Sequence, residues 1–202
     1  EYTEILAVPA PGPMTLDGRI SDWDRSAGVL ICGDVERAID ACCAWIHVMY
    51  DSSNLYLLGV FTDLTPLNNP IPITRDDPWE GDMLQFHLVP YPDAEQSKIS
   101  SVMAWRHSNT ADRVFIQYGA DYHEGEVRNA LAQGARQGFA INADQRGYVH
   151  ELAVPWRLLT PDGRAPFFEW FDSLKDNKTK SIILGRLDRL LLGNFGDHRR
   201  LN

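Results

Sequence analysis

The stretch AWIHVMYDSSNLYLLGVFTD, Ala44 to Asp63, decides the fold class of this chain. Both halves are rich in β-branched and aromatic residues, and the tetrapeptide Asp-Ser-Ser-Asn between them is a turn signal. Helix-capping signals are missing from the stretch. It therefore predicts a β-hairpin, two strands joined by a four-residue loop.

More short strands are expected after this hairpin. They are Gly81–Tyr91, Ser100–Ser108, Arg113–Gly119, Gly138–Asp144, Gly147–Trp156 and Lys180–Leu187. The two that flank Gln145 and Arg146 form a second expected hairpin. Short helical turns are expected at Val127–Ala135 and Glu169–Leu174, and the proline-rich segment Leu64–Thr74 is expected to be a loop.

Many short strands with turn signals between them and few helices are typical of an all-β fold. The sequence predicts an antiparallel β-sandwich, jelly-roll-like, with a few short helical turns. It contains no internal repeat, low-complexity tract or obvious linker, so residues 1–202 are expected to form a single domain.

The chain is acidic, with 28 Asp and Glu against 19 Lys and Arg and a formal net charge of −9. This charge argues against nucleic acid or an anionic membrane as a partner bound through bulk electrostatics. No stretch reaches the ~20 apolar residues of a membrane span, so membrane insertion is not expected. The opening EYTEILAVPAPGP has no signal-peptide pattern. The oligomeric state is left open.

Three cysteines, Cys32, Cys42 and Cys43, leave at least one thiol unpaired if any disulfide forms. Cys32 could close a short loop with either Cys42 or Cys43 in an oxidising compartment. The favoured interpretation is that all three are small buried hydrophobic residues.

Alternation along the strands assigns side chains to faces. Leu84, Phe86 and Leu88 are expected to face the core, and Met83, Gln85 and His87 the opposite, polar side. On the following strand, Met103 and Trp105 are expected on one face and Val102, Ala104 and Arg106 on the other. Gln85, His87 and Arg106 are expected to converge beside Trp79, although such a polar face can also simply meet water.

Trp79 lies in the acidic, turn-forming run RDDPWEGD, where an indole is unexpected. It is either a lid over the end of the core or a stacking platform for a ligand. An aromatic face with a few fixed hydrogen-bonding groups suits a neutral polyhydroxylated ligand.

The sequence offers little for catalysis. Nucleophile elbows, zinc-protease helices, phosphate loops and EF-hand loops are absent, and the six histidines show no metal-ligand spacing. Asp63, beside an asparagine-rich loop, is a candidate calcium ligand. The alternative is that Asp63 ends its strand with a hydrogen bond to the following turn.

Four motifs in order, LDGRISDW, VMYDSSNLYLLGVFTD, DDPWEGDMLQFHL and GYVHELAVPW, resemble the family 9 carbohydrate-binding modules. The resemblance runs from about Thr15 to Trp156. It implies a β-sandwich that binds poly- or oligosaccharide without catalysis, with a structural calcium ion, in a secreted, periplasmic or cell-surface protein. The chain is then a module of a larger carbohydrate-active enzyme or surface protein.

The resemblance also implies roles for individual residues. Trp79 matches the tryptophan that stacks on a sugar ring, and Arg106 an arginine that hydrogen-bonds sugar hydroxyls. Gln85 stands where the family has a glutamate with that role, and Asp63 matches an aspartate near the family calcium. The second tryptophan of the family is missing near the C-terminus, and Trp170 replaces it only if its segment folds back over the site.

Two other functions compete with carbohydrate binding. One is a degenerate member of the family that only spaces or contacts other domains. The other is a haem b-binding, cytochrome-like sandwich, for which Met83 and His87, with Met49 or Met103, are the candidate ligands. In a β-sandwich, methionines are more often core residues. An enzyme acting alone is not expected.

Overall fold

The structure is a computed structural model, and its described residues are 5–66, 68–69, 81–89, 99–106, 112–118, 126–160, 174, 176, 178 and 180–181. The chain divides into two compact units, Glu1–Arg164 and Ala165–Asn202. The single domain expected over residues 1–202 stays a prediction, because few positions of the second unit are described. Among the described residues, none of the helices has the length and apolarity needed to cross a lipid bilayer.

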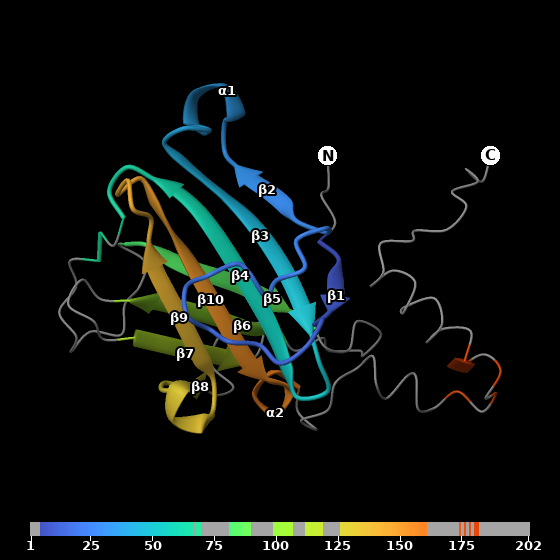
Figure 1. Ribbon diagram of the computed structural model, residues 1–202. Coiled ribbons are helices and arrows are strands. Elements are labelled where there is room, and N and C mark those ends of the chain that lie inside the picture. The colour runs from blue at the N-terminus through green and yellow to red at the C-terminus, as the bar shows by residue number, and fades with distance from the viewer. Residues whose placement is uncertain are drawn as a thin grey trace. The chain divides into compact units, whose positions relative to one another are not determined.

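The larger of two sheets is built around the hairpin expected at Ala44–Asp63 (Figure 1). Its strands are β1 (Ala7–Pro9), β2 (Val29–Cys32), β3 (Cys42–Tyr50), β4 (Asn54–Asp63), β9 (Arg136–Ile141) and β10 (Gly147–Pro155). β3 and β4 pair antiparallel, β10 lies on the other side of β4, and β9 follows β10. β1 and β2 both pair with the remaining edge of β3. Both predicted hairpins are therefore confirmed.

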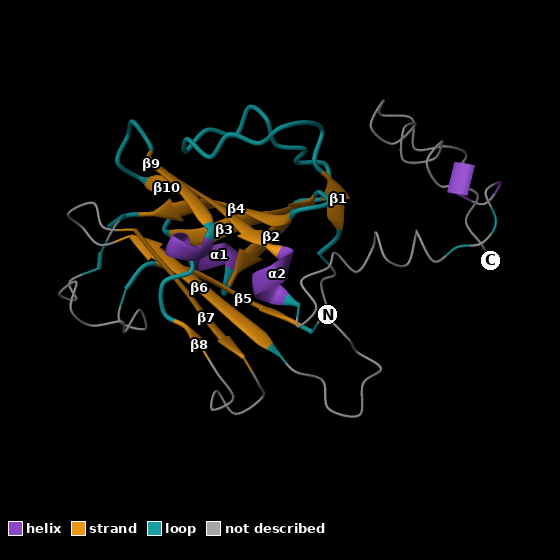
Figure 2. Ribbon diagram, turned by 90° about the horizontal axis from the view of Figure 1, so that it is seen from below, coloured by secondary structure: helices purple, strands orange, loops and turns teal. Residues whose placement is uncertain are grey.

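The smaller sheet is an antiparallel meander. Its strands are β5 (Met83–Leu88), β6 (Ser100–Arg106), β7 (Asp112–Tyr118) and β8 (Glu126–Val127), in that spatial order. Figure 2 shows the two sheets lying face to face. The all-β sandwich is confirmed, with one departure from a purely antiparallel arrangement: β1 runs parallel to β3. This parallel pairing is possible because the long link between β1 and β2, residues 10–28, carries the chain across the sheet before it returns as β2.

In the described part of the first unit, helix occurs in short pieces, α1 (Val35–Ala38), a 3₁₀ turn (Leu131–Gln133) and α2 (Trp156–Leu159). In the second unit, Lys178, Lys180 and Ser181 are helical. The turn expected at Val127–Ala135 is thus only partly helical. The strand expected from Lys180 is wrong at its start, where the Lys180 amide donates to the Asp176 carbonyl at 3.1 Å in a helical turn. The Asp176 side chain also accepts from the Lys178 amide at 2.9 Å, which favours a turn over an extended strand.

The core lies between the two sheets, where alternate residues of both face each other. The larger sheet contributes Leu55, Leu57, Leu152 and Val154, and the smaller sheet contributes Leu84, Val102, Val114 and Ile116; all are buried. Leu84 therefore faces the core, as alternation along β5 predicts. Burial of such side chains is the main term that holds two sheets together.

The outer face of the larger sheet is covered by the segment that links β1 to β2. Met14 and Trp23 from this segment pack on Met49, Tyr56, Leu58 and Ala153 of the sheet. The buried carboxylate of Glu151 accepts the Gly18 amide at 2.5 Å and the Trp23 Nε1–H at 2.7 Å. Gly18 has φ +80°, and a Cβ there would lie 2.5 Å from Ala140 Cβ, so the Asp-Gly turn has a steric reason.

Candidate functional site

A cavity of about 370 Å³ opens where β3 and β4 end and β5 begins. Its described lining is Ile31, Cys32, Gly33, Cys42, Cys43, Ala44, Phe61, Thr62, Asp63, Gly81, Asp82, Met83 and Tyr148. The volume is within the range of small-molecule sites. Five separate parts of the chain form it, and both sheets contribute. Gly81 and Asp82 directly follow the segment that carries Trp79.

One wall of the cavity is the end of an aromatic stack. The rings of Phe61 and Tyr148 stack with centroids 4.4 Å apart, and Phe139 stacks on the other side of Tyr148 at 4.8 Å. These rings come from the neighbouring strands β4, β10 and β9, which place them on the same face of the sheet. Both faces of the Tyr148 ring are therefore occupied, and its edge is left to meet the cavity.

Tyr148 is only 3% exposed. Burial raises the pKa of its phenol, and the neighbouring acidic groups, Asp82 foremost, raise it further. The phenol therefore stays protonated, with a hydroxyl that can donate and accept hydrogen bonds. None of the hydrogen bonds of the described residues involves this hydroxyl.

Asp63 ends β4 in the way that the structural alternative expects. Its Oδ1 accepts the Thr65 amide at 2.8 Å and lies 3.4 Å from the Thr65 hydroxyl. Calcium needs six to eight oxygen ligands. No group of three or more His, Cys, Asp or Glu side chains that could share a metal occurs among the described residues. Calcium at Asp63 therefore stays a prediction.

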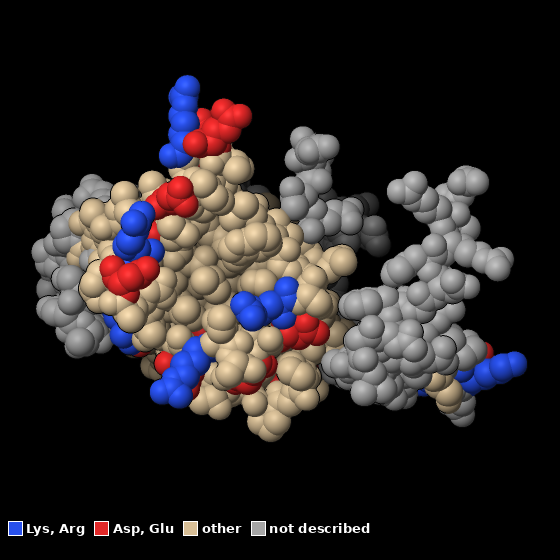
Figure 3. Space-filling view, turned by 45° about the horizontal axis from the view of Figure 1, so that its top comes forward, with Lys and Arg blue, Asp and Glu red and all other residues tan. Residues whose placement is uncertain are grey.

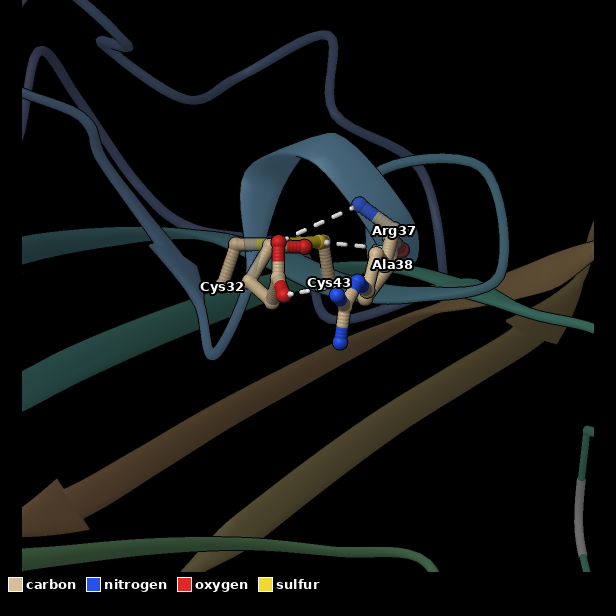
Figure 4. The surroundings of a disulfide bond; sticks show 5 residues. Cys32, Arg37, Ala38 and Cys43 are labelled. Carbon is tan, nitrogen blue, oxygen red and sulfur yellow. Dashed lines mark hydrogen bonds and ion pairs between the residues drawn. A yellow bond between two sulfur atoms is a disulfide. The ribbon is translucent and has the colours of Figure 1, made fainter.

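The lining of the cavity includes a disulfide, which joins Cys32 to Cys43 (Figure 4). These residues lie directly opposite each other on β2 and β3, with Cα atoms 4.7 Å apart. Cys42 is a free, exposed cysteine. The favoured interpretation of three buried, unpaired cysteines is wrong, because strand pairing brings Cys32 and Cys43 within bonding distance.

Gln85 and His87 lie side by side on the face of β5 that points away from the other sheet. Both are exposed, with 3.4 Å between Gln85 Nε2 and His87 Nε2. This outer face of the smaller sheet is polar and exposed to solvent only along β5. On β6 and β7 the same face carries Met103, Trp105 and Phe115, which are buried as a cluster.

Arg106 lies on the opposite face of the smaller sheet, toward the core. Its guanidinium makes two bonds to the Asp112 carboxylate, Nε–Oδ1 at 2.5 Å and Nη2–Oδ2 at 3.1 Å. It also lies over the ring of Phe139, 5.1 Å from the centroid. The predicted convergence of Arg106 with Gln85 and His87 is therefore not observed, because alternation turns Arg106 to the other side of the strand.

Trp79 and Trp170 lie outside the described residues. The chain on either side of Trp79 is held together by Asn69, whose side-chain amide donates to the carbonyls of Asp82 at 3.0 Å and Arg106 at 2.6 Å. The Asn68 amide also donates to the Asp82 carboxylate at 2.8 Å. The segment with Trp79 therefore starts and ends beside the cavity.

The methionines proposed as haem ligands are packing residues. Met49 and Met103 are fully buried, Met49 against the segment that links β1 to β2 and Met103 in the cluster on the smaller sheet. Met83 packs on the same cluster as Met103. Four residues of a strand separate Met83 from His87, a rise of roughly 13 Å along β5. Haem binding through Met83 and His87 stays a prediction.

Sequence reasoning missed most of the cavity lining. Phe61, Tyr148 and Cys42 are far apart in the sequence, and only the pairing of β3, β4 and β10 brings them together. Figure 3 shows one face of the molecule, on which charged side chains of both signs are scattered among the described residues.

No protein-family model matches the chain. The chain is similar to endo-1,4-beta-xylanase A of Thermotoga neapolitana, with 24% identity over 162 residues. The match covers 78% of this chain and 13% of the xylanase. The chain thus spans a small part of this relative, and the similarity connects most of the sandwich to one segment of a much longer enzyme named for its action on 1,4-β-xylan.

Proposed function

We propose that this chain is a non-catalytic carbohydrate-binding module. The observation that carries the proposal is the match to a xylanase, which covers 78% of the chain and 13% of the enzyme. A β-sandwich that corresponds to a small segment of a polysaccharide hydrolase is the kind of unit that holds the substrate for a catalytic unit. The order of four motifs, from the Asp-Gly turn to Trp156, supports the same function.

The proposed binding surface combines Trp79 with the open end of the sandwich. Trp79 is the stacking platform, and the exposed pair Gln85 and His87 on β5 supplies hydrogen bonds to sugar hydroxyls. Trp170 is a second candidate platform. The proposed contacts exclude Arg106, because its guanidinium is already bound to Asp112.

We also propose an extracytoplasmic location, secreted, periplasmic or at the cell surface. The disulfide between Cys32 and Cys43 supports it, because such bonds form and persist in oxidising compartments.

Retention on immobilised polysaccharides tests the proposal, with xylan, cellulose, mannan, chitin and chitosan as the panel. The chain should be retained on at least one of them, and Trp79→Ala should weaken binding about tenfold, because stacking on an indole contributes on the order of 1 kcal/mol. The purified chain should release no reducing sugar from the polysaccharide that it binds.

Trp45→Ala is the matched control, since Trp45 is a tryptophan on the outer face of β3 with 48% of its surface exposed. This variant should bind as the unchanged chain does. Absence of retention on every polysaccharide would contradict the proposal and favour a domain that only spaces or contacts others. Equal losses in the two variants would mean that Trp79 is not a specific platform.

A further inference from the structure

Asn69 joins three separate parts of the chain at one end of the smaller sheet. Its side-chain Nδ2 donates hydrogen bonds to the carbonyl of Asp82 at 3.0 Å and to the carbonyl of Arg106 at 2.6 Å. The last pair of β5 with β6 at this end is Met83 with Trp105, so Asp82 and Arg106 come directly after it. Asn69 therefore bridges the two strands at the point where their own pairing ends.

The two bonds depend on the amide group of the Asn69 side chain. Both partners are carbonyl oxygens, which only accept, and the NH₂ group of an amide has two hydrogens to donate. Asn69 is 5% exposed, so water cannot readily replace these bonds. An ionised aspartate of the same shape has no hydrogen to donate and would place a negative charge against two carbonyl oxygens.

Gly81 packs directly against this amide. A Cβ at Gly81 would overlap Asn69 Oδ1 and would lie 2.7 Å from the Asn68 carbonyl oxygen. The Asn68 backbone amide also donates to the Asp82 carboxylate at 2.8 Å. Residues 68–69 and 81–82 thus form one close contact, in which a residue without a Cβ is required at position 81.

This contact lies next to Trp79 in the sequence, because Glu80 alone separates Trp79 from Gly81. Two residues of chain span at most about 7 Å, so the placement of Gly81 restricts where the Trp79 indole can reach. In the other direction along the chain, Gln85 lies on β5, three residues after Asp82. The contact therefore links the proposed stacking platform to a proposed hydrogen-bonding residue of the same surface.

We propose that Asn69 is a positioning residue for Trp79, which fixes the backbone beside the indole so that Trp79 and Gln85 can contact the same sugar chain. The proposal rests on the proposed function and deepens it, because it names a residue that acts on the ligand only through Trp79. Fixing the backbone before the ligand arrives lowers the entropy cost of binding. Loss of the two bonds should therefore weaken binding, although no group that contacts the sugar is removed.

Fluorine NMR of the chain labelled with 5-fluorotryptophan measures the surroundings of each indole without any sugar. The chain has six tryptophans, and the resonance missing from Trp79→Phe is that of Trp79. In Asn69→Asp this resonance should move by more than its line width. The resonances of Trp23, Trp45 and Trp156 should keep their positions, because these residues belong to the link between β1 and β2, to β3 and to α2.

Affinity for the polysaccharide that retains the chain gives the second readout. Asn69→Asp should weaken binding about fivefold to tenfold, close to the loss expected for Trp79→Ala. With Trp79→Ala already present, Asn69→Asp should weaken binding by less than about twofold, because no platform remains to be positioned. Asn69→Ala adds no charge and should show the same dependence on Trp79, so it serves if Asn69→Asp folds poorly.

Two further variants separate positioning from a general loss of stability. Asn68→Ala is the matched control, because Asn68 is exposed and makes its bond through the backbone amide. Both readouts should be unchanged in this variant. Glu151→Ala removes the acceptor of Gly18 and Trp23 on the larger sheet and should leave the Trp79 resonance in place. Movement of that resonance in Glu151→Ala would overturn the proposal, because loss of stability alone would then explain it.

The outcomes separate this proposal from the proposed function. Retention that depends on Trp79, with both Asn69 variants binding as tightly as the unchanged chain, would overturn the positioning role alone. An unmoved Trp79 resonance in both Asn69 variants, or losses of affinity that multiply in the double variant, would also overturn it. A displaced Trp79 resonance in Asn69→Asp, with no retention of the unchanged chain on any polysaccharide, would support the positioning role and overturn the module.

Discussion

At the scale of residues, three of the four motifs that resemble the family contain residues with structural roles. The Asp-Gly turn and Trp23 are tied to Glu151, and the Trp156 indole donates to the Asp51 carbonyl at 2.9 Å. The Asp51 side chain accepts the amides of the hairpin loop that it begins. These residues are recognisable in the sequence because the fold requires them, whereas ligand-binding residues can change with the ligand.

Glu151→Ala should destabilise the sandwich by roughly 2 to 4 kcal/mol. The change leaves two buried donors, the Gly18 amide and the Trp23 Nε1–H, without an acceptor. It also frees the segment that covers the outer face of the larger sheet. Urea unfolding followed by tryptophan fluorescence measures the loss.

Glu126→Ala provides the comparison for Glu151, because Glu126 is exposed and its ion pair with the exposed Arg128 lies at the surface. Its loss should stay within ~0.5 kcal/mol. A similarly small loss for Glu151→Ala would show that the segment from Met14 to Trp23 does not depend on the carboxylate.

At the scale of elements, the corner that joins β2 to β3 is held by few contacts. α1 is four residues long and buries none of them. Its N-terminus is capped by the Asp34 side chain, which accepts the Arg37 amide at 3.2 Å. Figure 4 shows the disulfide lying beneath this turn, with Cys43 Sγ 3.2 Å from the Ala38 carbonyl oxygen. The disulfide thus adds a covalent constraint to the corner.

Cys32→Ser with Cys43→Ser should lower the free energy of unfolding by roughly 3 kcal/mol. The bond closes a loop with a sequence separation of 11 residues, and loops of this size gain about that much in the chain-entropy description. The urea midpoints of the double variant and of the oxidised chain give the difference.

Cys42→Ser should leave the urea midpoint unchanged, because Cys42 takes no part in the bond. A stability loss in Cys42→Ser, together with an unaffected Cys43→Ser, would mean that Cys32 pairs with Cys42 instead. Reduction with dithiothreitol should destabilise the Cys42→Ser variant as much as the unchanged chain.

At the scale of the whole molecule, the sandwich contains polar groups between its sheets. His150 of the larger sheet is 1% exposed, and its Nε2 has no hydrogen-bond partner among the described residues. Burial lowers the pKa of His150 to about 4, with the Arg106 charge acting in the same direction and the Asp112 charge opposing it. The fold therefore holds this imidazole in its neutral form.

The stability of the sandwich should fall as the pH drops from about 6.5 to about 4. In this window the unfolded chain binds a proton at His150 and the folded chain does not, so protonation favours unfolding. A shift of this size corresponds to an upper value of roughly 3 kcal/mol. Thermal unfolding midpoints across the window measure the slope.

His150→Leu should reduce the dependence of the thermal unfolding midpoint on pH between about 6.5 and about 4. His87→Gln, at an exposed histidine of β5, should leave this dependence unchanged. An unaltered slope in His150→Leu would assign the acid sensitivity to other groups.

Much of the fold could be predicted from the sequence, because alternation and turn residues are local signals. They identify both hairpins, the core face of β5 and the opposite orientation of Trp105 and Arg106. Non-local pairing leaves no such signal, so the parallel β1 was not predicted. For the same reason, the cavity between Cys42, Asp63 and Tyr148 was not predicted.

Which cysteine of β3 forms the disulfide with Cys32 depends on the register of β3 against β2. Cys42 and Cys43 are neighbours on β3, so their side chains point to opposite faces of the sheet. A bond from Cys32 to Cys42 would require β3 to slip by one residue against β2, and every side chain of β3 would then exchange faces. Met49 would turn into the space between the sheets and Ile46 out of it. Peptide mapping of the disulfide, a purely chemical assay, therefore reports which way a whole strand is facing.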